Sequence, residues 1–158
     1  MPAPQFVYES ETPYLEERIH AAAVYCSDGR IGEQMDEFLH HGLKLPRYDR
    51  VACPGGPVCL AGRMTAIWES RGVEDQLRFL IRAHEVTQVI LIGHSGCAYY
   101  RLHLGIPDTR LLQEQLVDLD RAASAIRRGL VGTAIEVKTY FAHRVESRVR
   151  FELVPQSS

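Results

Sequence analysis

One segment constrains the fold more than any other: Thr87–Ile92 (TQVILI) is β-branched and almost continuously apolar. Such a run predicts a strand that is buried on both faces, as the strands of parallel sheets are. His20–Tyr25 and Tyr48–Cys53 predict two further strands, and the second of these ends at the turn sequence Pro54-Gly55-Gly56. The chain is therefore expected to build a sheet whose central strands need a layer of helices on each side.

Helical spacing of apolar residues separates these strands. Ile31–His41 predicts the first helix, and Gly42 follows it at a position typical of helix ends. Pro57–Glu69 predicts a second helical stretch, which we expect to break near Ser70–Gly72 before another helix begins. That next helix is predicted from four apolar residues at helical spacing, namely Val73, Leu77, Leu80 and Ile81.

The remainder of the chain adds one long helix and two strands. The helix is predicted to begin near Asp108 or Thr109, either of which suits an N-cap, and to end near Gly129. Ala134–Ala142 and Arg148–Val154 alternate apolar with polar residues, as half-buried strands do, and are expected to pair as a hairpin at a sheet edge. The apolar stripe of the long helix is expected to consist of Leu112, Leu116, Leu119, Ala123 and Ile126.

The order of these elements defines the expected fold class. Alternation of strands and helices predicts an α/β fold with a parallel-core sheet, flanked by helices on both faces and carrying an antiparallel edge hairpin at the C-terminus. No repeat, low-complexity tract or linker interrupts the pattern, so residues 1–158 are expected to form a single domain.

Charge and hydropathy exclude several classes of partner. With 18 Lys and Arg against 20 Asp and Glu, the net charge of −2 offers no electrostatic case for binding nucleic acid or an anionic membrane. A local excess of Arg between Arg121 and Arg150 is interrupted by Glu136 and Glu146, so we interpret it as a solvated face. No apolar run approaches the roughly 18 residues that cross a bilayer. The acidic N-terminal sequence lacks the pattern of a secretory signal, so a cytoplasmic location is expected.

The residues with distinctive chemistry follow the three predicted strands. Ligands of open α/β sheets bind beyond the carboxyl ends of the strands. The segments Cys26–Arg30, Cys53–Gly56 and Gly93–Cys97 should therefore meet at one edge of the sheet. In a reducing compartment, the four cysteines are expected to be buried thiols, metal ligands or reactive groups instead of two disulfides.

Three of these residues form a candidate metal site. His94 and Cys97 are three positions apart directly after a strand, and Cys26 ends a neighbouring strand. Two thiolates and one imidazole are a donor set suited to Zn²⁺. Three protein ligands leave a fourth position for water or another ligand, as in catalytic zinc sites.

The same residues carry a resemblance to a known family. Cys26-Ser27-Asp28-Gly29-Arg30 together with His94-Ser95-Gly96-Cys97 resembles the C-x-D-S-R … H-x-x-C signature of β-class carbonic anhydrases, with Gly29 in place of the common Ser. The resemblance implies that Cys26, His94 and Cys97 bind zinc, and that Asp28 and Arg30 form a catalytic dyad beside it. It implies reversible hydration of carbon dioxide to bicarbonate by a zinc-bound hydroxide. It also implies a homodimer or an assembly of dimers.

Alternatives stay open at this point. Asp28 could itself take the fourth zinc position and exclude water. Gly29, and Ala98 where many members of the family have Gly, leave the substrate open, so hydrolysis of COS or CS₂ on the same zinc site is a second hypothesis. A non-catalytic zinc-binding or regulatory protein, including a redox sensor in which Cys53 and Cys59 react, is a third.

The other candidates have simpler interpretations. Cys53 and Cys59 are expected to be packing thiols, and Gly55-Gly56 a sharp turn that lets the backbone approach the metal site. His40, His41 and His103 are expected at the surface, with the last two as candidates for relaying protons. Tyr99 and Tyr100 are expected to pack inside the fold.

Overall fold

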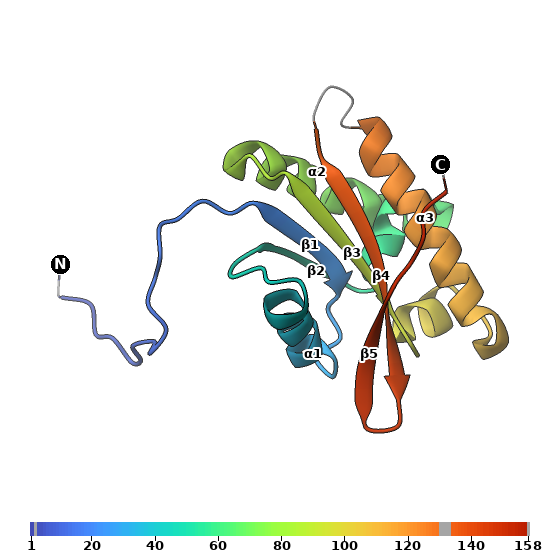
Figure 1. Cartoon of the computed structure of the whole chain (residues 1–158), viewed down its shortest axis with the longest axis horizontal. Coiled ribbons are helices and arrows are strands. Elements are labelled where there is room, and N and C mark those ends of the chain that lie inside the picture. Colours follow the sequence, from blue (N-terminus) through green and yellow to red (C-terminus); the bar gives the residue numbers. More distant parts are fainter. Residues whose placement is uncertain (2, 130–133, 158) are drawn as a thin grey trace.

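The computed structural model describes residue 1, residues 3–129 and residues 134–157. Within these residues, five strands form one mixed sheet in the order β2-β1-β3-β4-β5 (Figure 1). Neighbouring strands run parallel from β2 to β4, and β5 pairs antiparallel with β4 at the edge. The predicted α/β sheet with a C-terminal edge hairpin is confirmed. The strands are β1 (Ala21–Cys26), β2 (Asp49–Cys53), β3 (Gln88–His94), β4 (Glu136–Val145) and β5 (Arg148–Leu153).

Helices cover both faces of the sheet because successive strand residues point to opposite sides. The helix α1 (Gly32–Glu37), continued by a π-helical turn over Phe38–Gly42, lies on one face. The longer helices α2 (Ile67–His84) and α3 (Leu111–Gly129) lie on the other (Figure 1). In β1, the side chains of Ala22 and Val24 pack with apolar residues of α2 and α3, whereas alternate residues of the strand pack with α1. All six residues of β1 are buried, as a central strand requires.

The predicted break near Ser70–Gly72 is wrong, and the helical stretch predicted over Pro57–Glu69 is not one continuous helix. The chain instead forms 3₁₀ turns over Gly56–Leu60 and Met64–Ala66, separated by Gly62, whose φ of 72° is left-handed. The helix α2 then continues without interruption through Ser70–Gly72. A glycine inside a helix costs about 1 kcal/mol relative to alanine. Burial of Val73, Leu77 and Ile81 on the core side of α2 offsets that cost.

The start and the buried stripe of α3 also differ from expectation. Asp108–Arg110 form a 3₁₀ turn, and α3 itself begins at Leu111, so neither Asp108 nor Thr109 directly precedes the α-helix. Leu112 is 46% exposed, whereas two polar residues, Gln115 and Asp118, are buried. A stripe chosen by apolarity alone missed these positions because one oxygen of each side chain accepts a hydrogen bond from a residue outside the helix.

The register of the sheet brings three strand ends together, as predicted. Cys26 is the pairing partner of Cys53, and the backbone N–H of Ser27 donates to the carbonyl of Cys53 at 3.1 Å. His94 is the last residue of β3 and pairs with Ala142 of β4. The segments that follow β1, β2 and β3 therefore begin at one edge of the sheet, where parallel α/β folds bind ligands.

The N-terminal residues precede the sheet as an extended arm. Residues 3–18 contain no helix or strand, and Figure 1 shows them running away from the sheet. Three aromatic side chains of this arm are largely exposed, namely Phe6, Tyr8 and Tyr14. In the part of the chain that the structure describes, no helix is both long and apolar enough to cross a membrane.

Candidate metal centre

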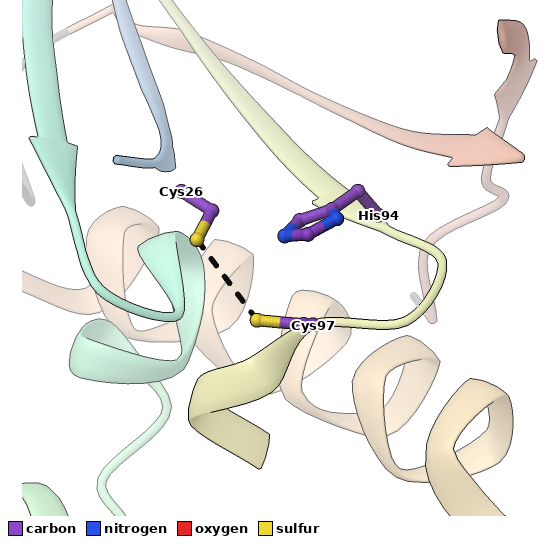
Figure 2. A group of neighbouring side chains, drawn as sticks. All are labelled: Cys26, His94 and Cys97. Atoms are coloured by element: carbon purple, nitrogen blue, oxygen red, sulfur yellow. Dashed lines mark hydrogen bonds between the residues drawn. The ribbon is translucent and has the colours of Figure 1, made fainter. Parts of the chain in front are cut away.

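Three side chains from two neighbouring strand ends converge on one point. Cys26 ends β1, His94 ends β3, and Cys97 follows in the turn after β3. The candidate ligand atoms, two sulfurs and an imidazole nitrogen, all lie within 4.8 Å of one another, and all three residues are buried. Figure 2 shows the three side chains pointing toward one another. The structure thus brings together the residues that the sequence proposed as metal ligands.

The imidazole of His94 is arranged as a metal ligand would be. Its Nδ1 lies 3.0 Å from the carbonyl oxygen of Ser95. A carbonyl only accepts, so Nδ1 carries the proton and Nε2 keeps a lone pair. This Nε2 is buried and has no hydrogen-bond partner among the residues described. The far edge of the ring faces the two sulfurs (Figure 2). A buried nitrogen without a partner costs about 1–3 kcal/mol, and a bound cation would remove that cost.

The separation of the two sulfurs also fits zinc. The Sγ atoms of Cys26 and Cys97 are 3.9 Å apart. Two thiolates bound to one tetrahedral Zn²⁺ at about 2.3 Å lie about 3.8 Å from each other. The donor set, its spacing and the orphaned nitrogen therefore all fit a single zinc ion.

Electrostatics favours a thiolate at this site. A hydrogen bond from Cys97 lowers the pKa of Cys26 to about 4, assisted by the backbone of Asp28. The pKa of Cys97 rises correspondingly, because its thiol donates to the Cys26 sulfur. The contact thus favours the thiolate form of one sulfur while the other keeps its proton. A cation that binds both sulfurs must displace the remaining thiol proton.

Asp28 and Arg30 form a bidentate ion pair beside this cluster. Nη2 of Arg30 lies 2.6 Å from Oδ2 of Asp28, and Nε lies 2.9 Å from Oδ1. The backbone N–H of Arg30 also donates to Oδ1 at 3.0 Å. These contacts with Arg30 lower the pKa of Asp28 to about 2, so its carboxylate is ionised at neutral pH. The side chain of Asp28 is 17% exposed, and that of Arg30 is 75% exposed.

The turn after β2 lies against the first metal-ligand strand. Gly55 and Gly56 have φ values of 79° and 55°, which favour glycine. A Cβ atom on Gly56 would lie 2.7 Å from the backbone nitrogen of Cys26, and one on Gly55 would lie 2.6 Å from the ring of Tyr99. The close backbone approach expected from the sequence is therefore present. The turn therefore packs directly against the backbone of Cys26.

A buried polar network behind the site was missed by sequence reasoning. Oε1 of Gln115 accepts a hydrogen bond from the backbone N–H of His94 at 3.4 Å. Asp118, which is fully buried, accepts from the hydroxyl of Tyr100 at 2.9 Å and from Nε of Arg63 at 2.6 Å. The signal was present in α3, because Gln115 and Asp118 lie three residues apart on one face between apolar residues.

The other candidate residues are placed less centrally. His41 and His103 are exposed, whereas His40 is half-buried with Nδ1 2.9 Å from the carbonyl oxygen of Leu45. His40 is therefore not the surface histidine that the sequence suggested, because the chain folds back over it after α1. Tyr100 is buried, as expected, and the ring of Tyr99 packs 4.6 Å from that of His103.

Comparison with known families shows which family the chain belongs to. The family model described as "Putative carbonic anhydrase" matches residues 16–151, which is most of the chain. The chain belongs to this family. It is a divergent member of the β-class of carbonic anhydrases, and the matched range contains all three residues of the cluster.

Solved carbonic anhydrases share the fold. The β-carbonic anhydrase CafA of Aspergillus fumigatus superposes with a TM-score of 0.53 at 14% identity, covering 89% of this chain and 78% of the other. A tetrameric β-carbonic anhydrase of Sordaria macrospora gives 0.51 at 13% identity, covering 85% and 81%. At this identity the likeness shows the fold alone.

Two curated relatives match this chain over only part of their own length. An uncharacterised protein of Rickettsia conorii is 25% identical over 102 residues, which are 65% of this chain and 50% of the other. An uncharacterised protein of Rickettsia bellii is 24% identical over 78 residues, 49% of this chain and 47% of the other. The chain spans about half the length of the curated relatives it matches.

Proposed function

We propose that this carbonic anhydrase relative binds zinc through Cys26, His94 and Cys97 and catalyses the reversible hydration of carbon dioxide to bicarbonate. The observation that carries the proposal is the orphaned Nε2 of His94, which faces two thiols separated by 3.9 Å. When bound there, zinc supplies Lewis acidity, which in catalytic zinc sites such as the three-histidine carbonic anhydrases lowers the pKa of water to about 7. Membership of the family supports the choice of substrate.

Asp28 is proposed to orient the reacting water. Its carboxylate is ionised because Arg30 lowers its pKa, so at neutral pH it accepts hydrogen bonds and donates none. An acceptor in a fixed position turns the water so that an oxygen lone pair faces the carbon of carbon dioxide. Arg30 acts through Asp28: two of its nitrogens hold the carboxylate in one orientation.

The ion pair also bears on whether Asp28 competes for the metal. Both carboxylate oxygens of Asp28 accept from Arg30, one at 2.9 Å from Nε and the other at 2.6 Å from Nη2. An Asp28 oxygen that bound zinc would have to leave this bidentate pair. We therefore propose that the fourth zinc position is open to water while Arg30 holds Asp28.

His94 is proposed to be held in place by two backbone contacts. Its Nδ1–H donates to the carbonyl of Ser95, which fixes the tautomer that leaves Nε2 free. Its own backbone N–H donates to Gln115, which lies on α3. The imidazole is thereby oriented from both the turn and the helix behind it.

Stopped-flow hydration of carbon dioxide, with zinc quantified on the same sample, tests the proposal. We expect activity that rises with pH at about one zinc per chain, and a loss of at least a hundredfold in kcat for Asp28→Asn with zinc retained. Glu74→Gln, which removes an exposed carboxylate from a pair with Arg78, is the matched control and should leave activity unchanged.

Three outcomes would contradict the proposal. Unchanged turnover of Asp28→Asn would remove Asp28 from the mechanism. Release of sulfide from COS or CS₂ by a zinc-loaded chain that does not hydrate carbon dioxide would show that the site acts on those substrates instead. A zinc-loaded chain inert toward all three substrates would indicate a binding or regulatory protein.

We also propose that the chain forms a homodimer or an assembly of dimers. The printed description of the Sordaria macrospora structures calls those proteins tetrameric. Phe6 and Tyr14 of the N-terminal arm, which are 85% and 88% exposed, are the proposed contacts with a second copy of the chain. Sedimentation analysis should give at least twice the monomer mass of 17.9 kDa, and a monomer at micromolar concentration would overturn the proposal.

A further inference from the structure

Two cysteines outside the metal cluster lie next to each other. Cys53 ends β2 and Cys59 lies in the 3₁₀ turn that follows, and their Sγ atoms are 3.8 Å apart. Cys53 is half-buried, whereas Cys59 is only 1% exposed. The proposed hydration reaction uses neither thiol. Two adjacent thiols in one short loop are more than packing residues, because they can be joined by a single covalent bond.

We propose that Cys53 and Cys59 are a reversible redox site that closes to a disulfide when the protein meets hydrogen peroxide, and that closure weakens zinc binding at Cys26. Peroxide first oxidises the more exposed sulfur, that of Cys53, to a sulfenic acid and releases one water. The sulfur of Cys59 then attacks it, forming the S–S bond and releasing a second water. Two thiols thus lose two electrons and two protons, and one peroxide is reduced to two waters.

The loop between the two cysteines can close with a modest movement. A disulfide needs an S–S distance of about 2.05 Å, so the sulfurs must approach by about 1.7 Å from their separation of 3.8 Å. Five residues separate the cysteines, and Gly55 and Gly56 are among them. These two glycines have positive φ and lack side chains, so they are the positions where the loop adjusts.

The same loop packs against both segments that carry the proposed metal ligands. Gly56 is so close to the backbone of Cys26 that an added Cβ would lie 2.7 Å from its nitrogen. Gly55 packs in the same way against Tyr99, two residues beyond Cys97. The carbonyl of Cys53 also accepts the backbone N–H of Ser27. A movement of this loop by more than 1 Å must therefore displace Cys26, because close-packed neighbours leave no slack.

The other close pair of thiols, Cys26 and Cys97, is the competing site of oxidation. Its sulfurs are 3.9 Å apart, but both residues are at least 94% buried and both are proposed zinc ligands. Coordinated thiolates are shielded by the metal, and burial limits access. In the zinc-loaded protein, Cys53 is the thiol that peroxide reaches first.

The experiment uses the zinc-loaded full chain treated with stoichiometric hydrogen peroxide, then alkylated and mapped by mass spectrometry. We expect loss of two thiols per chain, one linked Cys53–Cys59 peptide, and recovery of both thiols with dithiothreitol. Cys59→Ser should instead accumulate a sulfenic acid at Cys53 that dimedone traps. A Cys26–Cys97 linked peptide, or no linked peptide, would overturn the redox site.

Zinc release to a chromogenic chelator tests the second part of the proposal, that disulfide closure weakens zinc binding. Oxidised protein should lose zinc at least tenfold faster than reduced protein, since altering the groups that support a metal ligand typically costs 10–100-fold in affinity. Cys53→Ser should show no acceleration with the same peroxide dose, which controls for direct oxidation of the zinc ligands. A disulfide that forms without faster release would overturn the coupling. The proposed hydration is separate: a linked peptide in a chain inactive toward carbon dioxide would refute that function and leave the redox site standing.

Discussion

Replacement of Gly56 by alanine is the sharpest test of how the fold positions Cys26. An alanine at this position meets two costs. Its φ of 55° is left-handed, which costs a non-glycine residue about 1–2 kcal/mol. Its Cβ would also lie 2.7 Å from the backbone nitrogen of Cys26 and 2.7 Å from the carbonyl carbon of Tyr25, and such overpacking typically costs about 1–3 kcal/mol. We therefore expect Gly56→Ala to lower the free energy of unfolding by about 2–5 kcal/mol.

Gly62→Ala is the matched control, because it isolates the backbone cost. Gly62 has a φ of 72°, yet no described atom lies within 4 Å of the place where its Cβ would be. Its substitution should cost about 1 kcal/mol, because strain is partly offset by the reduced entropy of the unfolded chain. The difference between the two variants measures the contact with Cys26 and Tyr25.

Urea unfolding of the zinc-free proteins, followed by circular dichroism, measures both variants. With an m-value of about 1–3 kcal/mol/M, a difference of 2 kcal/mol moves the midpoint by about 1 M, which is easily resolved. Zinc affinity, measured by chelator competition, should fall at least tenfold for Gly56→Ala and stay unchanged for Gly62→Ala. Equal destabilisation and equal zinc affinity in the two variants would refute the claim that this turn positions Cys26.

Three further predictions concern the groups around the cluster. Arg30→Ala should raise the pKa of Asp28 from about 2 toward its ordinary 3.8. The stability that this carboxylate adds above pH 3.8, and that the wild type loses as the pH falls from 3.8 to about 2, should then disappear. Carboxyl-carbon NMR titration measures the pKa, and an unchanged value would contradict the ion pair. Zinc affinity should fall as the pH drops from 8 to 6, because Cys97, whose pKa is raised, must release its proton to bind; a chelator competition that is flat with pH would contradict this. Tyr100→Phe should lower the free energy of unfolding by about 1–2 kcal/mol, because it removes a hydrogen bond to buried Asp118. Tyr99→Phe should lower it less, because the Tyr99 hydroxyl has no partner in the described structure. Thermal unfolding compares the two variants, and equal losses of stability would refute the role of the network.

The sequence predicted that Cys26, His94 and Cys97 lie together because the relevant rule is topological. Buried strands followed by turns place their carboxyl ends at one edge of a parallel sheet, whatever the details of packing. The apolar run Thr87–Ile92 therefore located His94 and Cys97 beside Cys26 before any contact was known. The edge hairpin was equally predictable, because apolar and polar residues alternate along β4 and β5, as in strands with one buried face.

The parts that were not predicted depend on contacts distant in the sequence. Gly72 looked like a helix break, but packing of α2 against the sheet overrides the weak preference of one glycine. The pattern of α3 places Asp118 on the buried face, but the partner that allows a carboxylate to be buried there, Arg63, is 55 residues away and could not be inferred from that pattern. The contact of Cys53 with Cys59 required the left-handed glycine turn, which folds the chain back between them.

X-ray absorption at the zinc K-edge, on the zinc-loaded wild-type chain, tests the metal centre most directly. The structure predicts two sulfur ligands at about 2.3 Å and one histidine nitrogen at about 2.0–2.1 Å, with a light atom completing the shell. Cys97→Ser should lose one of the two sulfur ligands, whereas Cys53→Ser should keep both. A zinc shell made only of nitrogen and oxygen, or a sulfur count that Cys53→Ser changes and Cys97→Ser does not, would contradict the assignment of Cys26, His94 and Cys97.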